Sequence, residues 1–199
     1  MSLTAITYHG DMGRWEPDAR GRLEKAAMTL YVERGFEQTT VAEIAELAGL
    51  TERTFFRYFA DKREVLFSGA SALQELMVNA VREAPATLSP YDAIAQGIAA
   101  AGEAIGPGHD RARLRQHVID ANNELKEREL IKMATLSGAL ARALHERGVD
   151  EPTSSLAAEA GIAVFRVAFE RWVRSPDDVA LGVVIDESIA TLSAITHRG

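Results

Sequence analysis

The chain has 199 residues, and its 22 basic and 29 acidic side chains give a formal net charge of −7. Apolar residues make up 47% of it and cysteine is absent, which excludes disulfide and thiol chemistry. A chain of this length buries enough surface to fold as one or two domains without a metal. No apolar run approaches the roughly 20 residues of a membrane-spanning helix, and residues 1–13 lack the features of a signal peptide. We therefore expect a cytoplasmic protein without a membrane partner. The acidic net charge by itself argues against a nucleic-acid partner.

Apolar residues recur at helical spacing after residue 18, and the alternation typical of strands is nearly absent. The pattern predicts an all-α protein. The first helix is expected over residues 19–34. The second follows Thr40, which begins a capping box, and ends before Gly49. A short third helix is expected over residues 52–58, with Thr51 as its cap.

A fourth helix is expected from Asp61 to about residue 82, and longer helices separated by Pro, Gly and Asn follow Pro85. Their expected ranges are 90–105, 110–121, 124–147, 152–174 and 176–196. The expected organisation is a flexible arm (1–18), a compact three-helix domain (19–67) and a larger helical bundle (68–199). The helix that begins at Asp61 would belong to both the domain and the bundle.

The most informative segment holds two short helices joined at Gly49. A glycine permits the sharp reversal of a helix-turn-helix. The buried side of the second helix carries Phe55, so its opposite side presents Arg53, Phe56 and Arg57 to solvent. An ordinary αα-hairpin is the alternative, but it needs no bulky groups on that side. Two guanidinium groups around an exposed aromatic ring suit a DNA groove.

Several short motifs follow one another at fixed spacing between residues 23 and 67. They are Glu33-Arg34-Gly35-Phe36, Thr39-Thr40-Val41, Ile44-Ala45, Ala48-Gly49, Thr54-Phe55-Phe56, Tyr58-Phe59 and Lys62. Their combination resembles the DNA-binding domain of the tetracycline-repressor (TetR) family of bacterial regulators. The resemblance implies a nine-helix homodimeric repressor. Its helix-turn-helix domain would bind a palindromic double-stranded DNA operator, and its carboxy-terminal bundle would hold a small-molecule inducer and the dimer interface.

The resemblance also implies roles for single residues. Positions matching Thr40 and Lys62 contact phosphates, and positions matching Arg57 and Tyr58 contact the backbone or the groove wall. The bases are faced by positions that match Arg53, Thr54 and Phe56. Phe56 stands where the family more often has Tyr, so an apolar contact such as one with a thymine methyl group is expected there. The expected DNA-binding residues are Thr40, Thr51, Arg53, Thr54, Phe56, Arg57, Tyr58 and Lys62.

The last two helices are expected to form the dimer interface, through two stripes of small or apolar residues. The stripes are Ala157, Gly161, Val164 and Ala168 on one helix, and Leu181, Val184, Ser188, Leu192 and Ile195 on the other. The alternative is that both stripes pack inside a single subunit.

An inducer would need an apolar cavity with a few polar groups. The candidate lining residues are Met77, Met133, Phe165 and Phe169, with His117, Asn123 and Arg166 as polar groups. For each of them the alternative is an ordinary place in the core or on the surface. Residues 113–128 resemble a subclass of the family that responds to acyl-CoA-like ligands, so such an inducer is expected.

An enzyme is not expected. The histidines lack metal-ligand spacing, and Gly106-Pro107-Gly108 lacks the Lys-Ser/Thr of a phosphate-binding loop, so we expect no catalytic residue, metal or cofactor. The competing hypothesis is a helical bundle that processes or binds a small molecule and keeps the hairpin only as scaffold. That hypothesis predicts no sequence-specific DNA binding.

Overall fold

The computed structural model describes residues 18–175 and 179–196. All regular structure in these residues is helical, which confirms the expected all-α class. No helix in the described ranges is long and apolar enough to cross a membrane. The elements are α1 (Ala19–Arg34), α2 (Val41–Leu47), α3 (Glu52–Tyr58), the 3₁₀ turn η1 (Arg63–Val65), α4 (Ala70–Glu83), α5 (Pro90–Ile105), the 3₁₀ turn η2 (Gly106–Gly108), α6 (His109–Asp120), α7 (Asn123–Glu146), α8 (Glu151–Val173) and α9 (Leu181–Thr196).

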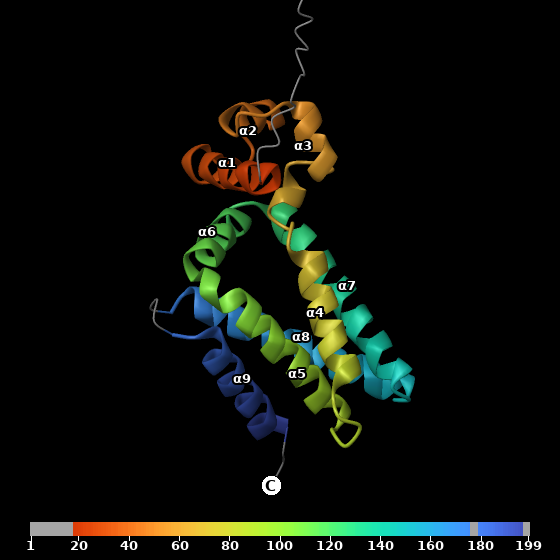
Figure 1. The fold of residues 1–199 in the computed structure, drawn as a ribbon. Helices are drawn as coiled ribbons and strands as arrows, with labels where there is room; N and C mark the ends of the chain where they lie inside the picture. The colour runs from red at the N-terminus through yellow and green to blue at the C-terminus, as the bar shows by residue number, and fades with distance from the viewer. Residues whose placement is uncertain (1–17, 176–178, 197–199) are drawn as a thin grey trace, which may run out of the picture.

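The molecule has two parts, which Figure 1 shows one above the other. Helices α1–α3 form a small group at one end, and α4–α9 form a longer bundle below it. Each part has its own cluster of buried apolar side chains. The expected arm, apart from Asp18, lies outside the described residues.

Local capping chemistry explains why several helices begin where the sequence predicts. The Thr40 hydroxyl accepts a hydrogen bond from the Glu43 amide, and the Glu43 carboxylate accepts one from the Thr40 amide. Thr51 caps α3 in the same way through the amide of Thr54. Ser89 caps α5, with a proline in the first turn. These side chains satisfy amides that have no partner inside the helix.

The expected fourth helix from Asp61 to residue 82 is wrong in its first third. Asp61 caps the short turn η1, and α4 begins only at Ala70. The reason lies in Val65, Leu66 and Phe67, which are all buried in the smaller core. Three consecutive residues of an α-helix point in directions spread over about 200°, so a tighter irregular path is needed to turn all three inward. The last helix also differs from expectation, because α9 begins at Leu181 and residues 176–178 lie outside the described ranges.

The smaller core is completed from the distant α6–α7 corner. Val118 and Ile119 near the end of α6 and Leu125 at the start of α7 are buried among the side chains of α1–α3. Residues 19–67 therefore do not form the smaller core alone. The bundle is attached to the small domain by apolar packing as well as through the chain at α4.

The two stripes expected at a dimer interface are mostly buried within the subunit. Ala157, Gly161, Val164 and Ala168 are all buried, as are Leu181, Val184 and Ser188. A Cβ atom on Gly161 would lie 2.2 Å from Ile94 of α5. The small residues of α8 therefore allow α5 of the same chain to approach closely, which was the alternative interpretation of this pattern.

Candidate nucleic-acid interface

The turn between α2 and α3 needs a glycine for two reasons. Gly49 has a φ of +66°, and the amides of Gly49 and Leu50 donate to the carbonyls of Glu46 and Ala45, as in a Schellman motif. A Cβ atom at this position would also lie 2.7 Å from the guanidinium of Arg22. Arg22 reaches across from α1 and donates to the carbonyl of Ala48. The angle between the two short helices is thus fixed by backbone hydrogen bonds and by one arginine.

Helix α3 buries Phe55 and exposes the opposite side. Arg53 is exposed and takes part in none of the ion pairs found among the described residues. Phe56 is 55% exposed, and its ring meets Phe55 edge-on at 5.5 Å between centroids. Much of the surface of this large apolar ring therefore has no contact within the subunit. It is available to a base or a sugar.

Arg57 and Tyr58 form a pair on the exposed side of α3. The guanidinium lies 4.9 Å from the centre of the Tyr58 ring and donates to the Tyr58 hydroxyl over 3.2 Å. Because the hydroxyl accepts from arginine, its own hydrogen remains free to be donated to an anion. The two side chains are therefore held together in an arrangement that can donate several hydrogen bonds to a phosphate.

The three expected threonine contacts already serve the helix starts. The Thr40 hydroxyl donates to the Glu43 carboxylate over 2.8 Å, and Thr51 and Thr54 share a hydrogen bond of 3.0 Å. Thr40 and Thr51 are exposed, and Thr54 is half-buried. DNA contacts from these hydroxyls would add to their capping role or replace a side-chain hydrogen bond.

Lys62 departs from its expected phosphate contact more clearly than the threonines do. Its ammonium group donates to the carbonyls of Phe36, Glu37 and Thr39 over 2.8, 3.3 and 2.9 Å. It also lies 4.3 Å from the centre of the Phe36 ring. An ammonium group has three donors, so a phosphate contact would have to replace one of these bonds.

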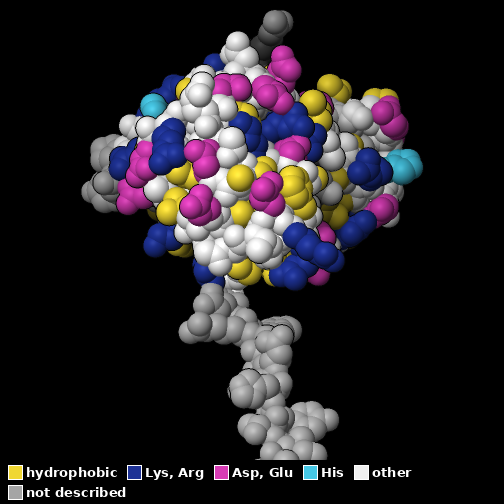
Figure 2. Space-filling view, turned by 90° about the horizontal axis from the view of Figure 1, so that it is seen from above, with side chains coloured by type: hydrophobic (Ala, Val, Ile, Leu, Met, Phe, Trp, Pro, Cys, Tyr) yellow, Lys and Arg dark blue, Asp and Glu magenta, His cyan; other side chains and the backbone are white. Residues whose placement is uncertain are grey.

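Charges of both signs are mixed on the end of the molecule that carries α1–α3. Figure 2 looks down on this end and shows basic and acidic side chains interleaved over it, without a broad basic field. Binding to this face would therefore depend on individual contacts more than on a general attraction to phosphates.

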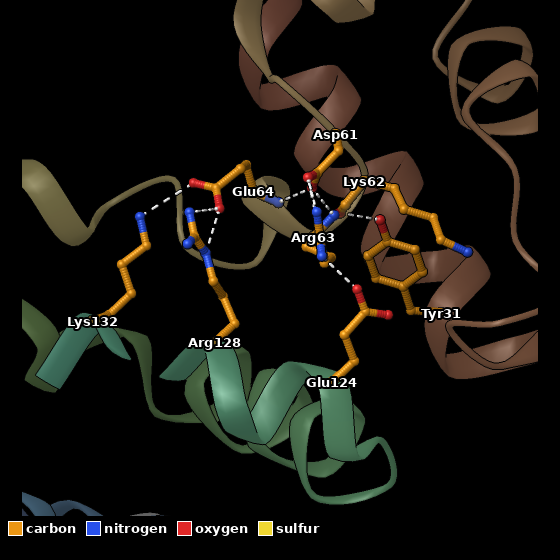
Figure 3. Close-up of polar contacts among 8 residues, drawn as sticks. All are labelled: Tyr31, Asp61, Lys62, Arg63, Glu64, Glu124, Arg128 and Lys132. Atoms are coloured by element: carbon orange, nitrogen blue, oxygen red, sulfur yellow. Dashed lines mark hydrogen bonds and ion pairs between the residues drawn. The ribbon is translucent and has the colours of Figure 1, made fainter. Parts of the chain in front are cut away.

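Ion pairs join the small domain to α7. The Glu64 carboxylate accepts from Arg128 over 2.8 Å and pairs with Lys132 over 3.2 Å, and Arg63 bridges Asp61 and Glu124. Figure 3 shows these α7 side chains pointing toward the turn η1. Sequence reasoning missed this junction, although the spacing of Glu124, Arg128 and Lys132 by four residues places all three on one side of a helix.

Helix α6 makes a second set of contacts with the small domain. Arg111 pairs with Glu24 of α1 over 2.7 Å. Arg115 donates to the carbonyl of Leu66 over 2.8 Å, and its guanidinium lies 5.0 Å from the centre of the Phe67 ring. Both ends of the α6–α7 corner therefore hold the small domain in one orientation.

The residues expected to line an inducer cavity divide between the larger core and the surface. Met77 and Phe165 are buried in the larger core, and Met133 and Phe169 are partly buried against it. The polar candidates lie on the surface: His117, Asn123 and Arg166 are exposed. The periodicity placed the apolar candidates correctly in the core, but it could not reveal on which side of α6–α8 the polar ones project.

Two hollows on the bundle contain none of these seven residues. One has a volume of about 210 Å³ and lies between α4 and α7, where Arg82, Arg142 and Glu146 are among its lining residues. The other has a volume of about 270 Å³ and lies between the α4–α5 loop and the end of α7, beside Pro90 and Arg147. Both are shallow openings on the outside of the bundle.

Comparisons with known proteins agree with this geometry. Residues 23–68 match the family described as bacterial regulatory proteins, tetR family. The chain is 28% identical over 185 residues to the HTH-type transcriptional regulator TcmR of Streptomyces glaucescens, covering 87% of this chain and 82% of that protein. The fold is similar to FadR from Bacillus subtilis in complex with stearoyl-CoA, at a TM-score of 0.62 and 20% identity over 89% of this chain and 99% of that one.

A second solved structure of similar fold is FadR from Thermus thermophilus in complex with lauroyl-CoA. Its TM-score is 0.55 at 21% identity, with 90% of this chain and 96% of that chain covered. The match of the helix-turn-helix segment and the relative matched over most of the chain lead to one assignment. The chain carries the DNA-binding domain of the TetR family of bacterial regulators over residues 23–68, and its relative along most of the chain is a transcriptional regulator.

Proposed function

We propose that this regulator is a repressor that binds a palindromic DNA operator as a homodimer and leaves it when a small molecule binds to the bundle. The observation that carries the proposal is the exposed side of α3. It presents Arg53, Phe56 and the paired Arg57 and Tyr58 on a helix whose other side is anchored in the core. Such a helix fits a major groove, where arginine reads guanine and apolar groups meet thymine methyl groups.

The proposed dimer uses the last two helices, but on α8 through a different face from the one that the sequence suggested. Leu156, Ala160, Ala163 and Val167 follow one another along α8 at helical spacing, and Leu156 is 72% exposed. On α9 the exposed apolar residues include Val183 and Ile195. Pairing this face with its copy would bury apolar surface from four helices.

One contact links the exposed sides of the two helices. Arg171, one turn beyond Val167 on α8, pairs over 2.8 Å with Glu187, one turn beyond Val183 on α9. This ion pair joins the exposed sides of α8 and α9, so the proposed interface would include both helices. A two-fold axis through such a surface makes the contact self-complementary.

The proposed inducer is acyl-CoA-like, since two structures of the same fold are FadR proteins bound to stearoyl-CoA and lauroyl-CoA. Its acyl chain would enter between the helices near the partly buried Met133 and Phe169. The larger core is closed around Met77 and Phe165, so ligand entry requires helices to separate. Separation that moves α7 would pull on Arg128 and Lys132, which hold Glu64 of the small domain. A ligand that favours this open state would thereby disfavour the DNA-binding arrangement.

The test is binding of the purified protein to DNA from upstream of its own gene, measured by fluorescence anisotropy over a range of salt concentrations. Arg57→Ala is expected to weaken binding and to reduce the slope of log K against log salt by about 0.9 for each half-site. Arg53→Ala should instead relax the preference for one base in each half-site. The control Arg142→Ala removes the same charge from α7 and should leave binding unchanged.

Two results would contradict the proposal. One is equal affinity for the upstream DNA and for unrelated DNA, which is the result that a helical bundle with a scaffold hairpin predicts. The other concerns the ligand: stearoyl-CoA and lauroyl-CoA are expected to release the wild-type protein from DNA. If neither affects the complex at saturating concentration, the proposed inducer class is wrong while the DNA-binding proposal stands.

A further inference from the structure

The side chain of Lys62 connects two segments that are far apart in the sequence. Residue 62 lies just after α3, and its ammonium group meets three carbonyls of the α1–α2 loop, those of Phe36, Glu37 and Thr39. Figure 3 shows the side chain extending away from Glu64 and toward Tyr31. Its direction is therefore opposite to that of the ion pairs with α7.

The backbone of the same residue is also held. The Tyr31 hydroxyl donates to the carbonyl of Lys62 over 2.6 Å, and Tyr31 is 2% exposed. The Tyr31 and Phe36 rings lie 5.3 Å apart, and the Lys62 ammonium lies over Phe36. Residue 62 is thus fixed at both ends against α1 and the loop that follows it.

The loop that Lys62 holds leads directly into α2. Gly35 has a φ of +84°, and the Thr39 hydroxyl donates to its carbonyl over 2.8 Å. Thr39 is 1% exposed and is followed by Thr40, the exposed cap of α2. Carbonyls that point together repel one another unless a cation lies between them, so the Lys62 ammonium sets the path of the chain into Thr40.

We propose that Lys62 is a positioning residue for operator binding, which acts by fixing Thr40 and α2 relative to α3, and that it does not contact phosphate. The inference rests on the proposed function of operator binding. It replaces the phosphate contact that the family resemblance implies for this position. The ammonium group of Lys62 binds carbonyls inside the protein, and other residues, including Arg57, make the phosphate contacts of this domain.

Two substitutions separate the possible roles. Lys62→Met removes the ammonium but keeps an unbranched chain of similar length. Lys62→Arg keeps the charge but replaces three divergent donors by a planar fork that does not match three convergent carbonyls. The variants are compared with Lys25→Met, which removes an exposed charge from α1 of the same domain, and with Arg57→Ala.

Operator affinity is measured at temperatures where circular dichroism shows each variant folded. We expect Lys62→Met to weaken binding by about tenfold, the size of one lost specific contact, with the wild-type salt slope unchanged. Lys62→Arg should not restore the affinity. A phosphate contact would give the reverse pattern: a slope reduced by about 0.9 for each half-site, restored by Lys62→Arg. Unchanged affinity together with lower thermal stability would also overturn the proposal, because it would leave Lys62 only a structural role.

A measurement without DNA keeps the inference separate from the proposed function. Acetic anhydride modifies free lysines, and mass spectrometry reports the rate at each site. In the wild-type protein Lys62 should react at least about tenfold more slowly than the exposed Lys25, as expected for donors engaged inside the fold. Equal rates would overturn the inference. A third outcome separates the two proposals. The wild-type protein would bind no operator, but Lys62 would be protected from acetylation and amide exchange at residues 36–40 would accelerate in Lys62→Arg. The proposed function would then fail, while the positioning of the loop by Lys62 would stand.

Discussion

At the scale of single residues, the turn η1 depends on the charge of Asp61. Its carboxylate accepts from the side chain of Arg63 over 2.6 Å and from the amides of Arg63 and Glu64. The hydrogen bonds from Arg63 are the main cause that lowers the pKa of Asp61 below its ordinary value of 3.8. Because the folded pKa lies below the unfolded one, the ionised carboxylate stabilises the fold above about pH 4, and this stabilisation is lost as the pH falls through the folded pKa.

Asp61→Asn is therefore expected to lower the free energy of unfolding by about 1 kcal/mol at pH 7, a modest value because the carboxylate is 36% exposed. The amide can still cap η1, so the difference isolates the charge. Urea denaturation should show the gap between variant and wild type narrowing as the pH falls below 4. Asp186→Asn on the exposed side of α9 serves as the control. A gap of the same size at pH 7 and pH 3 would contradict the assigned role of the charge.

The limits of sequence reasoning are clearest for cations. The sequence pattern predicted the helix-turn-helix, and the structure exposes Arg53 and Arg57 on α3 as expected. The sequence pattern could not distinguish these two arginines from Lys62 and Arg22, whose charges are directed at backbone carbonyls inside the domain. The difference depends on which carbonyls lie within reach after folding, and that is a property of tertiary structure. The same holds for His117 and Arg166, which share helices with core residues but point outward.

At the scale of elements, capping residues fixed most helix boundaries, because caps act over three or four residues. The start of α4 was missed for the opposite reason. The positions of Val65, Leu66 and Phe67 are decided by a core that includes Ile119 and Leu125 from the distant α6–α7 corner. Periodicity within one segment carries no information about such a core.

The junction between η1 and α7 makes an element-scale prediction. Glu64 is 21% exposed at its side chain and faces two cations of α7, so the pair with Arg128 should contribute about 1 kcal/mol in a double-mutant cycle of Glu64→Gln and Arg128→Met. Each single change and the double change are compared by urea denaturation. Additive effects would show that the observed contacts do not couple.

The same junction should control the orientation of the small domain. The chain has no cysteine, so two introduced cysteines, Glu46→Cys on α2 and Arg142→Cys near the end of α7, can carry spin labels. We expect one narrow distance distribution in protein diluted with unlabelled subunits, and a broader one after Glu64→Gln. Glu146→Gln breaks the pair with Arg82 inside the bundle and should leave the distribution unchanged. Broadening by both variants, or by neither, would contradict the role of Glu64.

At the scale of the whole molecule, the charge of −7 weakens non-specific attraction to DNA and gives more weight to specific contacts. Residues 14–67 carry 9 basic and 10 acidic groups, and the rest of the chain carries 13 and 19. The excess acidity therefore lies mainly in the bundle, and beyond about 8 Å its repulsion of DNA is screened at physiological salt. A single subunit with few phosphate contacts would bind weakly under these conditions. The proposed dimer would meet this requirement, because two recognition helices would act together.

The exposed stripe on α8 is where this requirement can be tested. Ala163 lies in the middle of the stripe between Leu156 and Val167, so Ala163→Arg places a charge at the centre of the proposed interface. Sedimentation should show the wild type at twice the subunit mass of 21.6 kDa and the variant at the single mass. Operator affinity should fall by about 10²-fold or more, because two linked half-sites are no longer engaged at once. Thr135→Arg on the exposed side of α7 adds the same charge elsewhere and should alter neither quantity. If Ala163→Arg remained dimeric, the interface would have to lie on another face. If it became monomeric with full affinity, the palindromic operator would be wrong, since half-sites about 34 Å apart require two subunits.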